Sequence, residues 1–442
     1  MRSVLENCWM ILPGHKVGYG GIVVEGDEIA EINFVENGMS SEQRTNRPAD
    51  HQKLVMPGLI NCHGHTAMTL VRGLGSGLPL QRWLEEAIFP VEAKMTPEDV
   101  YVGTAWGVRE MLAGGTTTVA DMYDFPGDCA RAFAEGGMKG RVCRVGLSFV
   151  EGRLAECIEF TRGFNSCASL TSGKDSASPL VAADFCIHSE YLTDEAFCRG
   201  LAEANKELKR PLHFHVSETE KEHRECIERH GKTPIAYLAE TGILDHGGYA
   251  AHCVWCTDDD FRIMAEKGVS LIHNPTSNMK LGSGFARITR AMELGVNVAL
   301  GTDGCASNDN LDMFEEMHIA SLVHKGLAKD PTALSAWDVI DMATKNGAKA
   351  LGMDDTGEIA VGKKADLCVV DLDKPHLTPC LDIPNLVVNS MHASDVVETI
   401  VSGKTVYEAS RKDAATGMSP PQLERRQAFL TAVKRIGLES LN

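Results

Sequence analysis

From residue 55 to about residue 350 the chain alternates between two kinds of segment. A short apolar run rich in β-branched residues is followed by a longer amphipathic segment, and the pair recurs eight times. The apolar runs are residues 55–62, 116–122, 141–149, 181–188, 211–216, 249–254, 269–273 and 296–301. This alternation is typical of parallel strands joined by helices. Eight such units predict an α/β fold, a closed (β/α)8 TIM barrel.

The two flanks of this region show a different pattern. Residues 1–54 and 357–409 alternate apolar and polar side chains and carry glycine-rich turns, which is typical of strands with one buried face. Because a few isolated strands are only marginally stable, we expect the two flanks to pair into one small β-sandwich. The predicted domains are a barrel over 57–356 and a sandwich built from 1–56 and 357–442, with a surface helix near the C-terminus.

The composition limits the kinds of partner. Hydrophobic residues make up 43% and charged residues 24% of the 442 residues, and no apolar stretch approaches the roughly 18 residues that cross a bilayer. The formal net charge of -18 argues against nucleic acid and membranes as partners. The N-terminal segment lacks the apolar centre of a secretion signal, and the 14 cysteines show no disulfide framework. We therefore expect a cytoplasmic protein with reduced, buried thiols.

Polar side chains recur where the predicted strands end. In a barrel of this kind, the carboxyl ends of the strands surround the active site. The residues at these ends are His63, His65, His188, His213, His215, Glu218, His252, His273 and Asp303. His63 and His65 alternate along one strand and so share a face. One such histidine alone would usually be a packing residue, but imidazoles and a carboxylate at equivalent strand ends indicate a metal-dependent site.

Five motifs in this order resemble the amidohydrolase superfamily. They are residues 57–65 (PGLINCHGH), 215–218 (HVSE), 251–253 (AHC), 273–278 (HNPTSN) and 301–304 (GTDG), followed by 357–362 (GEIAVG) and 365–367 (ADL). Within the superfamily, the chain resembles the group of deaminases and chlorohydrolases, and above all the 5'-methylthioadenosine/S-adenosylhomocysteine deaminase family. The resemblance covers nearly the whole chain.

The resemblance implies that His63, His65, His215 and Asp303 bind one divalent transition metal, with zinc favoured over iron. His213 shares a face with His215 and is the rival ligand, but we expect it to lie in a lower barrel layer or behind the ligands. Many two-metal relatives carry a bridging carboxylated lysine on the fourth strand. No lysine occurs between residues 181 and 192, so a single metal is expected.

The resemblance also implies the catalytic roles. The metal would lower the pKa of bound water from its bulk value toward about 7. Asp303 would accept the proton of this water, and Glu218 would deliver a proton to the ring nitrogen beside the attacked carbon. His252 would hold and polarise the hydroxide, and ammonia would leave.

Substrate-binding roles follow from the same resemblance. Trp83 belongs to a segment that covers the substrate, and Gln81 stands where some relatives carry a ribose-binding glutamate. Arg153 matches an arginine that reaches the substrate's tail, and His188 matches a residue that contacts the purine ring, beside Glu218. For Trp83 and Arg153, core packing and a solvated loop remain open alternatives.

The predicted function is hydrolytic deamination of an adenine nucleoside derivative: 5'-methylthioadenosine, S-adenosylhomocysteine, adenosine or 5'-deoxyadenosine. An alternative keeps the site but acts on guanine, a pterin or an s-triazine, with chloride as a further leaving group. A third alternative is a non-catalytic scaffold of the same fold. We expect a small purine-like molecule as the partner and a homo-oligomeric state. We also expect Asn278 and Lys280 to support loop structure rather than catalysis.

Overall fold

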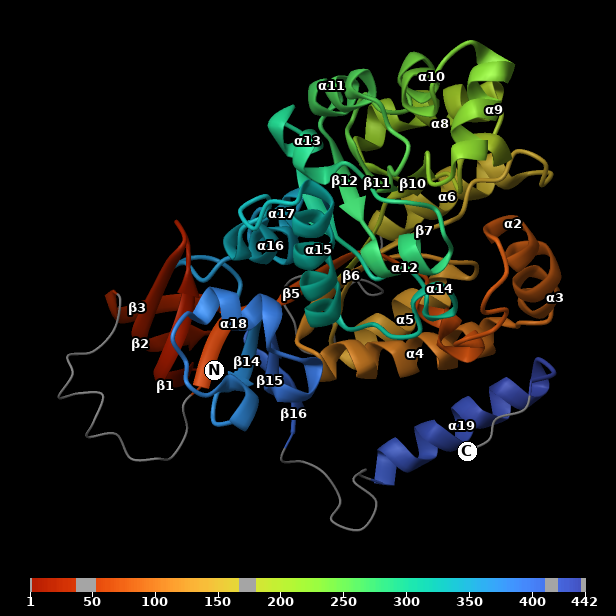
Figure 1. The fold of residues 1–442 in the computed structure, drawn as a ribbon. Helices are drawn as coiled ribbons and strands as arrows, with labels where there is room; N and C mark the ends of the chain where they lie inside the picture. The colour runs from red at the N-terminus through yellow and green to blue at the C-terminus, as the bar shows by residue number, and fades with distance from the viewer. Residues whose placement is uncertain (1, 37–52, 167–179, 410–419, 439–442) are drawn as a thin grey trace.

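The computed structural model describes residues 2–36, 53–166, 180–409 and 420–438 (Figure 1). Helices and strands alternate through the central part of the chain, and the fold is α/β, as the sequence predicts. The central strands are β5 (Leu59–Gly64), β6 (Thr116–Met122), β7 (Lys139–Cys143), β8 (Val181–Ala183), β9 (Phe185–Cys186), β10 (Leu212–Val216), β11 (Gly248–His252), β12 (Val269–His273) and β13 (Val298–Leu300). The longer helices between them and after them are α4 (Pro97–Ala113), α5 (Pro126–Gly136), α6 (Arg153–Ser166), α8 (Glu195–Leu208), α9 (Glu220–His230), α10 (Pro234–Glu240), α11 (Asp258–Lys267), α15 (Met313–Ala328) and α16 (Ala336–Ala343).

Shorter helical segments surround the carboxyl ends of the strands and connect the last elements. They are η1 (Thr66–Val71), α2 (Leu80–Arg82), η2 (Trp83–Ile88), α3 (Phe89–Glu92), η3 (Glu190–Leu192), α12 (Pro275–Lys280), α13 (Ile288–Glu293), α14 (Cys305–Asn308), α17 (Lys345–Ala350), η4 (Pro375–Leu377), α18 (Ile383–Asn389) and η5 (Ala393–Asp395). The segments α2, η2 and α3 follow one another without a break. They form the covering segment, residues 80–92, over one side of the central strands (Figure 1).

The central strands form two parallel sheets. One has five strands in the order β13-β12-β11-β10-β9, and the other has four in the order β5-β6-β7-β8. The sheets adjoin at β8 and β9, which are separated in the chain by Asp184 alone. On the other side, the amide of Asp303 donates to the carbonyl of His63 at 2.9 Å. No β-ladder joins β5 to β13 within the described ranges, so the strand pairing does not confirm the predicted closure of the barrel.

The apolar run 55–62 belongs to two strands rather than one. It is divided at Gly58 between β4 (Lys53–Pro57) and β5, which lie in different sheets. A Cβ at Gly58 would lie 2.3 Å from Thr117 Cγ2, so the Thr117 side chain packs directly on the backbone of Gly58 and leaves no room for a side chain there. The chain thus passes from the flank to the central strands next to the predicted boundary at residue 56.

The flanks pair with each other, as predicted, into one hydrogen-bonded sheet of seven strands. Its order is β16-β15-β14-β4-β1-β2-β3, with β1 (Arg2–Leu12), β2 (Lys16–Glu25), β3 (Glu28–Glu36), β14 (Leu367–Asp371), β15 (Val396–Val401) and β16 (Lys404–Glu408). A cluster of buried apolar side chains, among them Met10, Ile22 and Leu367, packs on this flank sheet. In Figure 1 the flank sheet lies to one side of the central strands. The arrangement as a two-layered sandwich is not confirmed by this pairing.

The C-terminal helix predicted over 420–438 is α19 (Pro420–Arg435), which packs against α4 (Figure 1). The rings of Trp106 and Phe429 stack there at a centroid distance of 4.9 Å. Among the described helices, none is both long and apolar enough to span a membrane. The thirteen cysteines within the described residues are free thiols, and all but Cys380 are buried, as predicted.

Candidate active site

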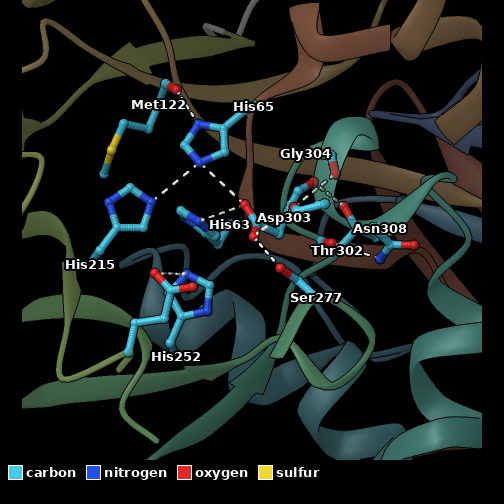
Figure 2. Close-up of polar contacts among 12 residues, drawn as sticks. His63, His65, Met122, His215, His252, Ser277, Thr302, Asp303, Gly304 and Asn308 are labelled. Carbon is cyan, nitrogen blue, oxygen red and sulfur yellow. Dashed lines mark hydrogen bonds and ion pairs between the residues drawn. The ribbon is translucent and has the colours of Figure 1, made fainter. Parts of the chain in front are cut away.

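The carboxyl ends of three strands bring together the four side chains predicted to bind a metal (Figure 2). His63 lies in β5 and His65 follows it, His215 lies in β10, and Asp303 follows β13. His63 Nε2 and His65 Nε2 lie 3.3 and 3.2 Å from Asp303 Oδ1. His65 Nε2 lies 3.2 Å from His215 Nε2. The parallel strands therefore place these residues at one point, as their sequence positions predict.

This cluster fits a metal ion. Ligand atoms of His63, His65 and Asp303 lie within 4.8 Å of one another, and so do those of His63, His215 and His252. His63 Nε2 is buried, and apart from its 3.3 Å contact with Asp303 Oδ1 it has no partner within the described residues. A buried polar atom of this kind is costly unless a partner satisfies it. Imidazole nitrogens with a carboxylate oxygen are the donors that zinc and iron prefer, so the cluster can hold such an ion.

The opposite nitrogen of each of these imidazoles has a partner outside the cluster. The contacts are His63 Nδ1 with His213 Nε2 at 2.8 Å, His65 Nδ1 with the Met122 carbonyl at 2.5 Å, and His215 Nδ1 with the His188 carbonyl at 2.7 Å. Such contacts orient the rings and direct Nε2 inward. His213 thus lies behind His63, in agreement with the prediction that it supports the ligands.

Asp303 is held as an anion. Ser277 Oγ and Ser307 Oγ donate to its Oδ2 at 2.6 and 3.0 Å. Burial alone raises the pKa of Asp303, but the hydrogen bonds and charges of His63 and His65 outweigh this and hold the pKa well below its usual range. The carboxylate is therefore ionised and oriented, as a ligand or a base requires.

Glu218 and His252 lie beside this cluster. Glu218 is buried, follows β10 and accepts a hydrogen bond from Ser283 Oγ at 3.3 Å. His252 Nε2 lies 3.8 Å from Glu218 Oε2. Burial raises the pKa of Glu218, which brings its protonated form closer to neutral pH. A carboxyl in this setting can deliver and recover a proton.

Asn278 has a closer connection to the site than the sequence suggests. Its Oδ1 lies 2.8 Å from His252 Nδ1, so it accepts a hydrogen bond when that nitrogen carries the proton. In that tautomer, His252 Nε2 faces Glu218 with a free lone pair. The prediction that Asn278 only shapes its loop is therefore incomplete. The sequence feature that could have indicated this contact is the motif 273–278, in which Asn278 lies at the end of the first helical turn after the strand.

A cavity of about 450 Å³ opens above these residues. Its polar lining includes His65, His188, His215, Glu218, His252 and Asp303, and its apolar lining includes Trp83, Leu84, Phe125, Leu147, Phe149 and Tyr191. Burial, with nearby histidines, lowers the pKa of His188 to about 3, so its ring is neutral. Of the predicted substrate-binding residues, Trp83, His188 and Glu218 line the cavity.

Gln81 and Arg153 do not line this cavity. Gln81 is exposed, and its Oε1 accepts a hydrogen bond from Lys221 Nζ at 2.5 Å. Arg153 is buried; its Nη1 donates to the Val145 carbonyl at 2.8 Å, and its Nε lies 3.1 Å from Glu156 Oε2. The covering segment turns Trp83 inward, which directs Gln81, two residues earlier on a helical path, outward. The structure therefore does not support the roles expected of these two residues.

Glu92 is a lining residue that the sequence reasoning missed. It ends α3, and its Oε1 accepts a hydrogen bond from Tyr123 Oη at 2.6 Å. Burial raises the pKa of Glu92. In the sequence it is one of three glutamates in the covering segment, with Glu85 and Glu86, and no spacing rule distinguishes it. Its position after Pro90, at the end of the segment, is the one available signal.

Known proteins are similar to this chain over most of its length. A 5-methylthioadenosine/S-adenosylhomocysteine deaminase of Acetivibrio thermocellus is 45% identical over 357 residues, which cover 80% of this chain and 81% of that protein. A 5'-deoxyadenosine deaminase of Methanosarcina mazei is 42% identical over 418 residues, covering 92% and 93%. A crystal structure of an adenosine deaminase from Xanthomonas campestris with bound zinc superposes with a TM-score of 0.85 at 30% identity, covering 98% of each chain.

The family assignment rests on the same part of the chain that carries the site. The profile of the amidohydrolase family matches residues 54–406, a range that includes every residue of the metal cluster together with Glu218 and His252. The resemblance seen in the five sequence motifs is thereby confirmed. The chain belongs to the amidohydrolase family.

Proposed function

We propose that this protein is a metal-dependent aminohydrolase that releases ammonia from an adenine nucleoside derivative. The candidates are 5'-methylthioadenosine, S-adenosylhomocysteine, adenosine and 5'-deoxyadenosine. The observation that carries the proposal is the buried carboxyl of Glu218 on the cavity wall, 3.8 Å from His252 and beside the His and Asp cluster. The names of relatives at 42 and 45% identity support the same reaction.

His63, His65, His215 and Asp303 would hold one divalent transition metal, with zinc favoured because a solved relative contains it and iron as the alternative. When bound, such a metal would supply an acidified water, with a pKa of about 7, far below that of bulk water. A single ion agrees with the absence of lysine between residues 181 and 192.

The residues around the cluster divide the proton transfers. Asp303, kept ionised by its neighbours, takes the proton of the attacking water at its carboxylate. Glu218, with its raised pKa, delivers a proton to the ring nitrogen next to the attacked carbon. His252 orients the attacking oxygen through Nε2, while Asn278 bonds its Nδ1. The proton held by Asp303 then passes to the amino group, which leaves as ammonia when the C–N bond breaks, and the proton of the added hydroxyl returns to Glu218 as the carbonyl forms.

The cavity lining supports a nucleoside. The neutral ring of His188 suits contact with a purine, and Trp83 contributes apolar surface. We assign contact with the ribose hydroxyls to Glu92 rather than Gln81, because Glu92 lines the cavity and Gln81 is bonded to Lys221 outside it. A carboxylate is also the stronger acceptor for a diol.

We also propose that the two central sheets are parts of one (β/α)8 barrel domain over residues 57–356. Residues 1–56 and 357–442 would form the companion domain with the terminal helix. The parallel order of the strands and the contact of Asp303 with His63 across the open side support this arrangement. A homo-oligomeric state in the cytoplasm remains a prediction.

Metal analysis followed by an ammonia-release panel tests the function. Purified protein is assayed for bound zinc and iron, and then with adenine nucleosides, guanine, a pterin and an amino-s-triazine, with E218Q as the control for contaminating deaminases. We expect about one metal per chain and turnover of at least one adenine nucleoside that E218Q loses. If the protein turns over only guanine, the pterin or the triazine, that compound class would replace adenine nucleosides as the proposed substrate. Metal-free protein with no turnover would favour the scaffold and contradict the proposal.

A further inference from the structure

Glu222 makes an unusual contact with the backbone that carries Glu218. Its Oε1 accepts a hydrogen bond from the amide of Ser217, and its Oε2 accepts one from the amide of Glu218, both at 2.8 Å. One carboxylate thus holds two consecutive amides. Glu222 is buried, which raises the pKa of its carboxyl to about 7, whereas the two amides and the dipole of α9, in whose first turn it lies, favour the ionised form.

The backbone held by Glu222 has a conformation that residues with side chains rarely adopt. Ser217 has a φ of 48°, in the left-handed region. This turn reverses the chain between the end of β10 and the start of α9, and it directs Glu218 into the cavity. The Ser217 carbonyl accepts a hydrogen bond from the Trp255 amide at 2.9 Å. The turn is therefore fixed on its carbonyl side by the loop after β11 and on its amide side by Glu222.

The helix that carries Glu222 is anchored at both ends. Thr219 caps its start and accepts a hydrogen bond from the Glu222 amide at 3.2 Å. At its far end, Arg229 and His230 pair with the buried carboxylate of Glu190 at 2.7 and 3.0 Å. A helix fixed in this way is a rigid support, and precise placement of a catalytic group requires one.

We propose that Glu222 is a positioning residue for the proton donor, and this inference rests on the role of Glu218 in the proposed function. Glu222 holds the amides of Ser217 and Glu218, keeps the turn left-handed and thereby aims the Glu218 carboxyl at the substrate ring. Without it, two buried amides lose their acceptor, and the turn is free to relax toward a commoner conformation. Glu222 itself does not line the cavity.

The test compares E222Q with E220Q. Glutamine at position 222 fills the same volume but offers one acceptor oxygen, so its amide group would oppose one of the two backbone N–H donors. Glu220 lies in the same first turn of α9 and is exposed, so E220Q makes the same chemical change and the same charge change without touching the turn. E222D adds a variant that keeps the charge but is one methylene too short to reach both amides.

For E222Q and E222D, we expect kcat to fall about 10- to 100-fold with KM within about threefold, the usual cost of misplacing a catalytic group. Metal content should equal that of the wild type, and E220Q should match the wild type in every respect. Hydrogen exchange of the amides in residues 216–219 should accelerate in E222Q and E222D but not in E220Q. This measurement reports the turn directly and does not depend on activity.

Three results would overturn the inference. These are a kcat for E222Q within about twofold of the wild type, an equal loss of kcat in E220Q, and unchanged amide exchange over 216–219. Loss of metal from E222Q would show that Glu222 supports the metal cluster instead. If the wild type deaminates no purine, the proposed function has failed, and the exchange experiment still decides whether Glu222 holds the turn.

Discussion

The flank sheet and the cluster at the strand ends bury very different side chains. The buried face of the flank sheet is formed by residues such as Met10, Ile22 and Ile29, which are fully apolar. At the strand ends, the buried side chains are imidazoles and carboxylates, and His252 and Asp303 have φ values of 72° and 63° in the left-handed region. The first arrangement gains free energy by removing apolar surface from water. The second costs free energy through desolvation and backbone strain, which is typical of functional sites.

This difference has a consequence that mutations can test. Substitutions in the flank sheet should change the free energy of unfolding and leave turnover unchanged. Substitutions at the strand ends should change turnover more than stability, and some should increase stability. The outcome of each of the following substitutions would support or contradict this difference between the two regions. They are ordered by the size of the expected effect.

Asp303→Asn should have the largest effect. The amide keeps the volume but loses the charge that, in the proposed function, binds the metal and accepts the proton, so we expect kcat to fall about 10⁴-fold or more, with reduced metal content. Ammonia release and metal analysis measure both. D309N, at an exposed aspartate shortly after α14, is the control. Substantial activity in D303N would refute the role of Asp303.

Glu218→Gln should retain the metal and lose about 10² to 10⁴ in kcat, the usual contribution of general acid-base catalysis. Glutamine cannot donate a proton to the ring nitrogen, although it preserves shape and hydrogen bonding. Steady-state kinetics with metal analysis separates this case from that of Asp303. Should the metal be lost as well, Glu218 would belong to the ligand set and the assignment would change.

Ile22→Ala should lower the free energy of unfolding without affecting catalysis. Ile22 is fully buried in β2, and such truncations cost about 2 to 5 kcal/mol through lost burial and the remaining cavity. Urea unfolding should show a lower midpoint, while kcat of the folded protein at 25 °C should be unchanged. Val35→Ala, at an exposed position on β3, should show neither effect. A drop in kcat for I22A would mean that the two regions are coupled.

Glu316 should make stability depend on pH. It is buried in α15 and accepts a hydrogen bond from Asn308 Nδ2 at 2.7 Å, and burial raises its pKa from 4.5 to about 8. The folded state therefore holds a proton that the unfolded state releases above pH 4.5. The stability contributed by this group is fully present below pH 4.5 and is lost as pH rises through 8.

E316Q should remove part of this dependence. Between about pH 6 and pH 9, the free energy of unfolding should fall by on the order of 2 kcal/mol more in the wild type than in E316Q. Urea unfolding at the two pH values measures the difference. Equal losses in both proteins would show that Glu316 does not change its protonation on folding.

Glu92→Gln should have the smallest effect. The amide can still contact a diol but loses charge assistance, so we expect KM for an adenine nucleoside to rise about tenfold with little change in kcat. E86Q is the matched control, because Glu86 lies exposed in the same covering segment. An unchanged KM in E92Q would remove Glu92 from the substrate site, and a matching rise in E86Q would point to the segment as a whole.

Most of the metal cluster could be predicted before the structure was known. His63 and His65 alternate along a strand, and His215 and Asp303 occur at the ends of other parallel strands, so strand geometry predicts that they converge. The resemblance to the amidohydrolases selected these four among the polar residues at the strand ends. Their surroundings could not be predicted in this way. The partner of His63 is His213, 150 residues away, and the partner of His252 is Asn278, 26 residues away. These contacts depend on the direction in which each side chain points in the folded chain, and the spacing of residues along the sequence does not determine that direction.

The main strands of the fold could also be predicted from the sequence, but not every strand boundary. The alternation of apolar runs and helices predicted the parallel central strands, and the alternating flanks predicted that these segments pair with each other. The division of the run 55–62 at Gly58 between two sheets was missed, because a continuous apolar run is equally compatible with one strand. Which sheet each half joins is decided by its strand partners, β1 and β14 for β4 and β6 for β5, which lie far from it in the sequence.

The sequence by itself determined the α/β fold, the family and the residues that converge at the strand ends, because strand periodicity is local and regular. The tertiary structure alone decided which side chains of the irregular segments line the cavity. It placed Glu92 and Trp83 in the cavity wall, and it directed Gln81 and Arg153 away from it. The physical reason is that short helical turns have no long-range period, so packing against distant parts of the chain decides which way each side chain points.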